Sequence, residues 1–146
     1  MELSSRVRYA LLALLELASH QKQGDFLQIE HIAANHQIPE RYLAQLLMSL
    51  RRYGLVRSQR GAKGGYLLAH EPSKITMREV LTCLEGDKNL EFDNHTAFSL
   101  TPEGVAIEAV WQEAAQAAIA VLQGYTLQDL CNKRDENKHL NPMYYI

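Results

Sequence analysis

Apolar side chains recur every three or four positions in four stretches of the N-terminal part of this chain, and this spacing predicts amphipathic helices. The helices are expected at residues 3–18, 28–36, 39–53 and 76–86. Residues 55–60 and 66–69 instead predict two short strands, which are joined by the glycine-rich turn 61–65. The order helix, helix, helix, hairpin is typical of a winged helix-turn-helix, in which the third helix enters the major groove of DNA.

Residues that favour helix ends stand at these boundaries. Ser4 can cap the first helix, and Pro39 favours a new helical start because proline is tolerated in the first turn. Gly54 suits the position after a helix, where the backbone adopts a left-handed conformation. Thr76 and Glu79 have the spacing of a capping box, so the fourth helix is expected to begin at this threonine.

A long apolar helix is predicted to follow the threonine and proline at 101 and 102. Of the eighteen residues from 105 to 122, fourteen are apolar, and the four polar ones lie within about 140° of the helical wheel. A helix that rests on one layer needs an apolar stripe of only about 100°, so this helix must be covered on more than one side. A membrane span is the alternative, but two glutamates and two glutamines disfavour it. We therefore expect a second copy of the chain to cover this helix, through Val110, Trp111, Ala114, Ala118 and Val121.

A short final helix is expected from Thr126, and it would pack Leu127, Leu130 and Cys131. The chain ends in Tyr-Tyr-Ile, and large apolar residues at a terminus indicate docking rather than fraying. The expected fold is therefore mainly α with a small β wing, and a long dimerisation helix follows the winged helix-turn-helix. The parts are a DNA-binding domain, a connecting helix with a sensor-type loop, and a dimerisation helix with the C-terminal segment, at 1–70, 71–101 and 102–146.

Charge is distributed unevenly along the chain. The 15 Lys and Arg residues against 17 Asp and Glu give a net charge of −2, yet residues 1–70 carry nine basic and five acidic residues. From residue 41 to residue 70 there are six basic residues and no acidic one. A one-sided cationic surface is the electrostatic footprint of a polyanion binder, although a solvated basic surface without a partner gives the same pattern.

The basic segment places polar side chains where a winged helix meets DNA. Four residues of the third helix fall within about 60° of one another, opposite its leucines: Arg41, Gln45, Met48 and Arg52. Arginine and glutamine carry the donors that recognise guanine, adenine and phosphate. The hairpin adds further cations, and its glycines let the backbone approach a phosphate closely. The residues predicted to contact DNA are Arg41, Tyr42, Gln45, Arg51, Arg52, Arg57, Arg60, Lys63, Gly64 and Gly65.

Other functional classes have little support. The N-terminus lacks the pattern of a secretory signal, and the two cysteines, Cys83 and Cys131, match neither a disulfide framework nor a zinc finger. No catalytic constellation or phosphate-binding loop stands out, and His31 and His36 do not have ligand spacing on one helix face. We therefore expect a cytoplasmic protein with free thiols that is not an enzyme.

Several linked motifs resemble one family of regulators. They are LSSRVRYA at 3–10, IPERYLAQLL at 38–47, LRRYGLV at 50–56, RGAKGGY at 60–66 and ITMREV at 75–80. As a set they are similar to the IscR-like winged-helix transcription regulators, a group that includes the NsrR, RirA and CymR types. The C-terminal part is similar in layout, with a loop, a long helix, a short helix and a Tyr-Tyr-Ile ending. The resemblance implies a homodimeric, sequence-specific regulator of double-stranded DNA, such as a repressor.

The loop before the long helix departs from many members of that group. Those members hold an iron–sulfur cluster there with three cysteines, whereas residues 86–101 of this chain contain none. The usual triplet is therefore excluded, but a cluster with other ligands is not, because two subunits could pool Cys83, His95 and Cys131. The CymR type implies that the fold can act without a cluster, through a protein or small-molecule effector. These three residues are the candidate sensors, although packing is the simpler interpretation of both thiols.

Two other hypotheses stay open at this level. A winged helix can serve as a protein-interaction module. An enzyme or a redox thiol protein is the third class, and the missing catalytic constellation argues against it. Salt dependence separates the first from a DNA-binding protein, because phosphate contacts make the affinity fall steeply as salt rises.

Overall fold

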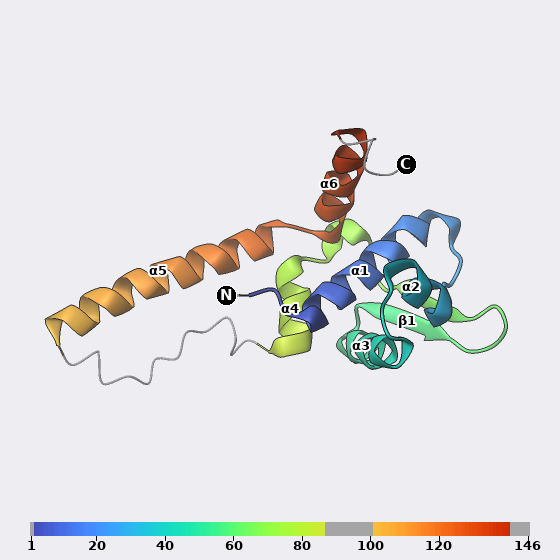
Figure 1. Cartoon of the computed structure of the whole chain (residues 1–146), viewed down its shortest axis with the longest axis horizontal. Coiled ribbons are helices and arrows are strands. Elements are labelled where there is room, and N and C mark those ends of the chain that lie inside the picture. The colour runs from blue at the N-terminus through green and yellow to red at the C-terminus, as the bar shows by residue number, and fades with distance from the viewer. Residues whose placement is uncertain (1, 87–100, 141–146) are drawn as a thin grey trace.

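The computed structural model describes residues 2–86 and 101–140, and Figure 1 shows a helical body from which one long helix projects. The helices are α1 (Ser5–His20), α2 (Ile29–His36), α3 (Glu40–Tyr53), α4 (Met77–Glu85), α5 (Pro102–Gly124) and α6 (Leu127–Leu140), with short 3-10 turns η1 (Gln21–Gln23) and η2 (Pro72–Lys74). Strands β1 (Val56–Gln59) and β2 (Gly65–Leu68) form one antiparallel hairpin. The predicted mainly α fold with a small β wing is confirmed, and the helices and strands of the first 86 residues end within two residues of their expected limits.

The helix ends follow the capping residues in the sequence. The Ser4 hydroxyl accepts a hydrogen bond from the backbone N–H of Val7 at 3.2 Å, and Thr76 and Glu79 form a complete capping box. Gly54 ends α3 with a φ of 94°, a left-handed conformation that glycine adopts without strain. These local signals fix where the third helix stops and the wing begins.

One hydrophobic cluster holds the helices of the body together. Leu14 of α1, Ile32 of α2 and Leu47 of α3 are fully buried in it. Each such side chain contributes about 1.5–3 kcal/mol when it leaves water, so this contact fixes α2 and α3 against α1. The cluster also includes residues beyond position 70, namely Ile75, Val80, Leu84 and Leu127. The domain limits at 70 and 101 stay a prediction, while the core itself crosses both of them.

The wing is attached to the body through its backbone. Within the hairpin, Val56 pairs with Leu68 and Gln59 pairs with Gly65. Leu27, in the segment before α2, exchanges two backbone hydrogen bonds with Tyr66 of β2, at 2.9 and 2.8 Å. The hairpin is therefore tied directly to the start of the helix-turn-helix.

α5 extends away from the body as an arm in Figure 1. Its C-terminal end is fixed by two backbone hydrogen bonds of 2.9 Å, one from the Met77 N–H to the Tyr125 carbonyl and one from the Leu127 N–H to the Ile75 carbonyl. These bonds join the chain at the start of α4 to the chain between α5 and α6.

The expectation of a short final helix is wrong in length, because α6 has 14 residues. It begins after Thr126, whose hydroxyl accepts a hydrogen bond from the Asp129 N–H, while the Asp129 carboxylate accepts one from the Thr126 N–H. Beyond Cys131 the described residues are mostly polar and exposed, so apolar periodicity gave no sign that the helix continues. The Arg134 guanidinium donates to the Ser19 hydroxyl of α1 at 2.6 Å and holds α6 against the body. The expected docking of residues 144–146 lies outside the described residues.

Candidate nucleic-acid interface

α3 has one buried face and one exposed face. Its four leucines are at most 2% exposed, whereas Met48 on the opposite side is 51% exposed. Arg41, Gln45 and Arg52 are exposed together with it. The structure therefore brings the four predicted residues together on one surface, as their helical spacing requires. Their contact with DNA stays a prediction.

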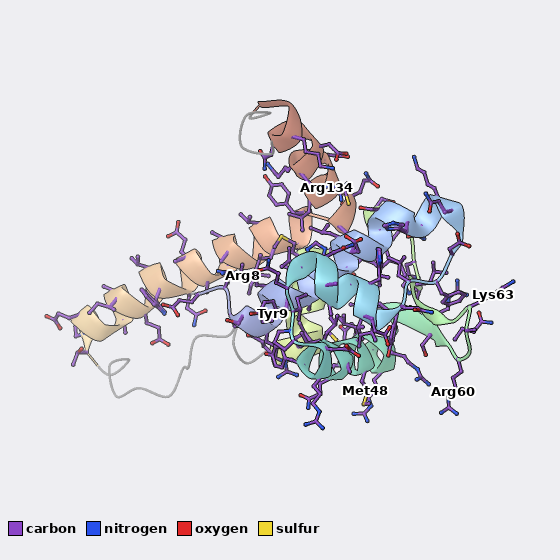
Figure 2. The ribbon with its side chains drawn as sticks, turned by 45° about the vertical axis from the view of Figure 1, so that its right-hand side comes forward. Arg8, Tyr9, Met48, Arg60, Lys63 and Arg134 are labelled. Carbon is purple, nitrogen blue, oxygen red and sulfur yellow. The ribbon has the colours of Figure 1, made fainter. Side chains whose placement is uncertain are left out.

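The wing contributes cations to the same region. Arg57, Arg60 and Lys63 are all exposed on the hairpin of β1, β2 and their connecting turn. Figure 2 shows Met48 of α3 and Arg60 of the wing projecting to the same side of the molecule, while Lys63 extends from the outer end of the hairpin. The exposed face of α3 and the wing together form what we call the basic face.

The cations of the basic face have no partner among the residues that the structure describes. Within residues 2–86 and 101–140, none of these side chains forms a hydrogen bond or an ion pair: Arg41, Arg51, Arg52, Arg57, Arg60 and Lys63. By contrast, Arg78 donates to the side-chain oxygen of Gln123 at 3.0 Å. A guanidinium without an internal partner loses no protein contact when it binds a phosphate or a base. The basic face is therefore available to a polyanion.

Tyr42 has a different environment from the rest of the predicted set. It is half-buried, and its ring meets the ring of Tyr9 edge-to-face, with the centroids 5.8 Å apart and an interplanar angle of 81°. This arrangement is favourable for two aromatic rings and fixes the start of α3 against α1. Only the exposed part of Tyr42 is left to meet DNA.

Gly64 and Gly65 are required by the shape of the wing. A Cβ on Gly64 would overlap the backbone oxygen of Gln59, and a Cβ on Gly65 would overlap that of Leu27. Gly64 is also buried, and Gly65 has a φ of 141°. Packing therefore explains glycine at both positions, and their predicted contact with DNA stays a prediction.

The two candidate sensor thiols are packed against helices. Cys83 is half-buried in α4, and its Sγ donates to the backbone oxygen of Ser49 at 3.5 Å. Cys131 in α6 is 6% exposed. This burial agrees with its interpretation from the sequence as a small packed apolar residue. Burial raises the pKa of both thiols, and the nearby guanidinium groups, Arg6 for Cys83 and Arg134 for Cys131, offset this only in part. His95, the third candidate, lies outside the described residues.

This donor set does not fit an iron–sulfur cluster of the usual kind. Such clusters are held by several cysteine thiolates, whereas the chain has two cysteines in all. Both thiols lie on helices, one with a backbone hydrogen bond and one buried, and burial favours their protonated form. We therefore derive no role for a cluster.

The arm α5 presents an apolar face to solvent. Val110, Trp111 and Val121 are 67, 56 and 57% exposed. Ala114 is exposed and Ala118 is half-buried, so the five predicted dimer residues have little cover within one chain. Several large apolar side chains on one exposed helix face mark an interaction surface. Pro102–Gly124, with a mean hydropathy of 1.3, is also long and apolar enough to cross a membrane, but helices of soluble proteins can meet the same two criteria.

No two histidines have ligand spacing on one helix face, but tertiary packing places two of them beside a glutamate. The structure brings Glu16, His20 and His31 together, with one ligand atom from each within 4.8 Å of the others. The first two are four residues apart on α1, which places them on one helix face and was the only available sequence signal. His31 joins them from α2 through tertiary packing, which spacing along the sequence does not reveal.

Comparisons with known proteins agree with this geometry. A family model described as Rrf2, iron-dependent transcriptional regulator, matches residues 3–133. The chain is 35% identical to the HTH-type transcriptional regulator CymR of Bacillus subtilis, over 100% of both chains. The solved structure of CymR (YrzC), described as the global cysteine regulator of B. subtilis, matches with a TM-score of 0.78 and 34% identity, over 91% of this chain and 98% of that one. IscR of T. potens matches with a TM-score of 0.76 and 32% identity, over 94% and 91% of the two chains.

Proposed function

Since this chain belongs to the Rrf2 family of transcriptional regulators, we propose that it binds a roughly palindromic DNA operator as a homodimer and represses transcription there. Its relatives CymR and IscR are named HTH-type transcriptional regulators, so the chain is a DNA-binding regulator rather than an enzyme. A regulator of this kind acts on DNA in the cytoplasm.

The basic face is the observation that carries the proposal. α3 enters the major groove and directs Arg41, Gln45 and Arg52 toward base edges, where bidentate arginine and glutamine contacts discriminate between bases. Arg51 and the exposed part of Tyr42 lie at the flanks of this helix face. The wing cations bind phosphates or the minor groove, which positions α3 without reading the sequence.

The exposed face of α5 supports the homodimer. When the α5 helices of two copies pack against each other, their apolar side chains leave water, which contributes about 25 cal/mol per Å² of buried apolar surface. A two-fold axis between the copies places the two α3 helices in successive major grooves, about 34–36 Å apart. An operator that matches this symmetry is an approximate palindrome.

The effector is a small molecule or a partner protein rather than an iron–sulfur cluster. The cysteine-free segment 86–101 and the packing of both thiols support this part of the proposal. Because the Bacillus relative is described as a global cysteine regulator, genes of sulfur metabolism are the first targets to test.

Selection of binding sites from random DNA tests the proposal, with fluorescence anisotropy on the selected duplex at several salt concentrations. We expect an enriched palindrome whose half-sites lie about 10 base pairs apart or a multiple of that. Affinity should fall steeply as salt rises, because phosphate contacts release counterions. A protein-interaction module, the rival function, would enrich no sequence, and that result at low salt would overturn the proposal. Light scattering at micromolar concentration tests the dimer separately, and a monomeric mass would contradict it.

A further inference from the structure

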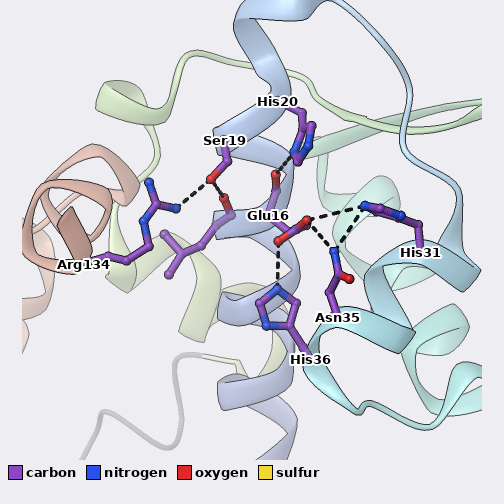
Figure 3. Close-up of polar contacts among 8 residues, drawn as sticks. Glu16, Ser19, His20, His31, Asn35, His36 and Arg134 are labelled. Atoms are coloured by element: carbon purple, nitrogen blue, oxygen red, sulfur yellow. Dashed lines mark hydrogen bonds and ion pairs between the residues drawn. The ribbon is translucent and has the colours of Figure 1, made fainter. Parts of the chain in front are cut away.

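Glu16 is the centre of a polar cluster at the junction of α1 and α2, as Figure 3 shows. One oxygen of its carboxylate lies 3.0 Å from Nε2 of His36, and the other accepts a hydrogen bond from Nδ2 of Asn35, also at 3.0 Å. His31 Nε2 lies 3.8 Å from the oxygen that Asn35 contacts. His20 approaches from the next turn of α1. None of these residues belongs to the basic face or to the exposed face of α5.

Hydrogen bonds fix which ring nitrogens carry lone pairs. His20 Nδ1 lies 3.0 Å from the backbone carbonyl of Glu16, and because a carbonyl only accepts, this nitrogen carries the proton. In the neutral form of this ring, the lone pair of His20 is therefore on Nε2. Asn35 Nδ2 lies 3.2 Å from Nε2 of His31, and because an amide nitrogen only donates, the lone pair of His31 is on Nε2.

We propose that Glu16, His20 and His31 bind a divalent transition-metal cation of the Zn²⁺ type, with His36 orienting the carboxylate. Two imidazoles and a carboxylate are the donors that such ions prefer, and three protein ligands leave one position for water. The protein ligands of a tetrahedral ion lie about 3.3 Å apart, given bonds of about 2.0–2.1 Å. The pair of Glu16 and His31 atoms is at 3.8 Å, and all three ligand atoms are within 4.8 Å, so small side-chain rotations close the site.

Asn35 shows that this space suits a positive group. Its amide nitrogen donates to both the Glu16 carboxylate and the His31 ring, so two lone pairs converge on the same donor. A cation takes that place and satisfies both lone pairs when the amide turns outward. Asn35 is exposed, so its amide can turn to solvent.

The proposed ligands are held by hydrogen bonds of the kind that orient the ligands in known metal sites. Histidine ligands commonly donate their second ring N–H to a backbone carbonyl, as His20 does to Glu16, and carboxylate ligands are held by further hydrogen bonds, as Glu16 is by His36. Both oxygens of the Glu16 carboxylate are held in this way, one by Nε2 of His36 and the other by Nδ2 of Asn35.

An ion at this site would link α1 to α2, the first helix of the helix-turn-helix. Entry is open, because the His31 side chain is 53% exposed. His31 also lines a surface hollow of about 270 Å³ whose other side is formed by Ala62, Lys63 and Gly64 of the wing. The site therefore lies beside the wing, although binding of the ion requires neither DNA nor dimerisation.

Titration calorimetry of the untagged full-length protein with Zn²⁺ tests the site. The variants are H31A, the double variant H20A/H31A, and H70A as a control that removes an exposed histidine outside the cluster. We expect the wild type and H70A each to bind one more Zn²⁺ per chain than the double variant binds. H31A should bind this additional ion at least about tenfold more weakly than the wild type does. Zn²⁺ should also raise the Tm of the wild type more than that of the double variant.

Equal Zn²⁺ stoichiometry and affinity in the wild type and in a folded double variant would overturn the proposal. If the double variant does not fold by circular dichroism, H31A decides, because its side chain is mostly exposed; unchanged affinity there overturns the site. Mg²⁺ serves as a comparison ion, since it prefers oxygen ligands. The assigned metal class would be overturned if the wild type released heat with Mg²⁺ but not with Zn²⁺, and if H31A abolished the heat from Mg²⁺.

Discussion

Cys83 in α4 donates a hydrogen bond from its Sγ to the backbone oxygen of Ser49 in α3, over 3.5 Å. The Ser49 hydroxyl in turn donates to the backbone oxygen of Gln45 at 3.3 Å, one helical turn nearer the start of α3. The thiol therefore contacts α3, the helix that carries the basic face. Chemical modification of Cys83 would displace this contact, so the reactivity of this thiol is worth measuring.

We expect both thiols to react slowly with iodoacetamide at pH 7.5. Burial raises the pKa of Cys83 and of Cys131, so a smaller fraction of each is thiolate at neutral pH than in free cysteine. Reactivity should increase as the pH rises toward these pKa values. Mass spectrometry of timed samples measures each site, with the urea-unfolded protein as the reference. Equal rates in the folded and unfolded protein would contradict the packing of the thiols.

Replacing Gln45 by alanine should relax base preference at one position of each half-site. Gln45 is exposed on α3 between Arg41 and Met48, and a bidentate amide contact to adenine is worth about 1–3 kcal/mol of discrimination. Anisotropy with the selected operator and its single-base variants measures this loss. If discrimination is unchanged at every position, Gln45 does not read a base.

Replacing Lys63 by alanine should weaken binding to all DNA sequences about equally. Lys63 is exposed on the wing and has no partner in the described part of the chain, so its loss should reduce the slope of affinity against salt by about one. Lys138→Ala is the matched control, because that lysine lies on α6, which Figure 1 places on the other side of the body from α3. A loss confined to one sequence would make Lys63 a base-reading residue instead.

A carboxylate on the apolar face of α5 should separate the subunits. Val110 is 67% exposed in one chain, so Val110→Glu leaves the fold intact but introduces an unpaired charge into the proposed interface. Light scattering should show a monomer, and specific DNA binding should be lost. Gln116→Glu adds the same charge at an exposed polar position of α5 and should stay dimeric. A dimeric Val110→Glu variant would place the interface elsewhere.

Gly65→Ala should destabilise the wing by about 1–3 kcal/mol, measured by urea unfolding. Its new Cβ would meet the backbone oxygen of Leu27, in addition to the strain of a φ of 141°. Gly61→Ala is the comparison, because Gly61 also has a positive φ, 109°, but has no atom near the position of a Cβ. Equal losses in the two variants would show that backbone strain alone requires glycine at position 65.

The features that sequence could predict are those with a local cause. The capping box of Thr76 and Glu79, the stop at Gly54 and the exposed face opposite the leucines of α3 all depend on residues within a turn or two of one another. The polar second half of α6 could not be predicted, because a helix surrounded by water needs no apolar residues at every third or fourth position. The cluster around Glu16 was missed because His31 reaches it from another helix. Packing of Gly65 against Leu27 likewise depends on a tertiary contact that no local pattern encodes.

The paired backbone hydrogen bonds between the segments at residues 75–77 and 125–127 have a mechanical consequence. They act as a fulcrum, because they fix the end of α5 nearest the body while its 23 residues extend for about 35 Å. A rotation of about 5° at this fulcrum moves a point at the far end by about 3 Å, close to the rise of one base pair, about 3.4 Å. In a dimer joined through α5, the angle of this lever would therefore set the distance between the two α3 helices, and with it the spacing of the half-sites. An effector that shifts the angle slightly would change which operators the dimer can bind.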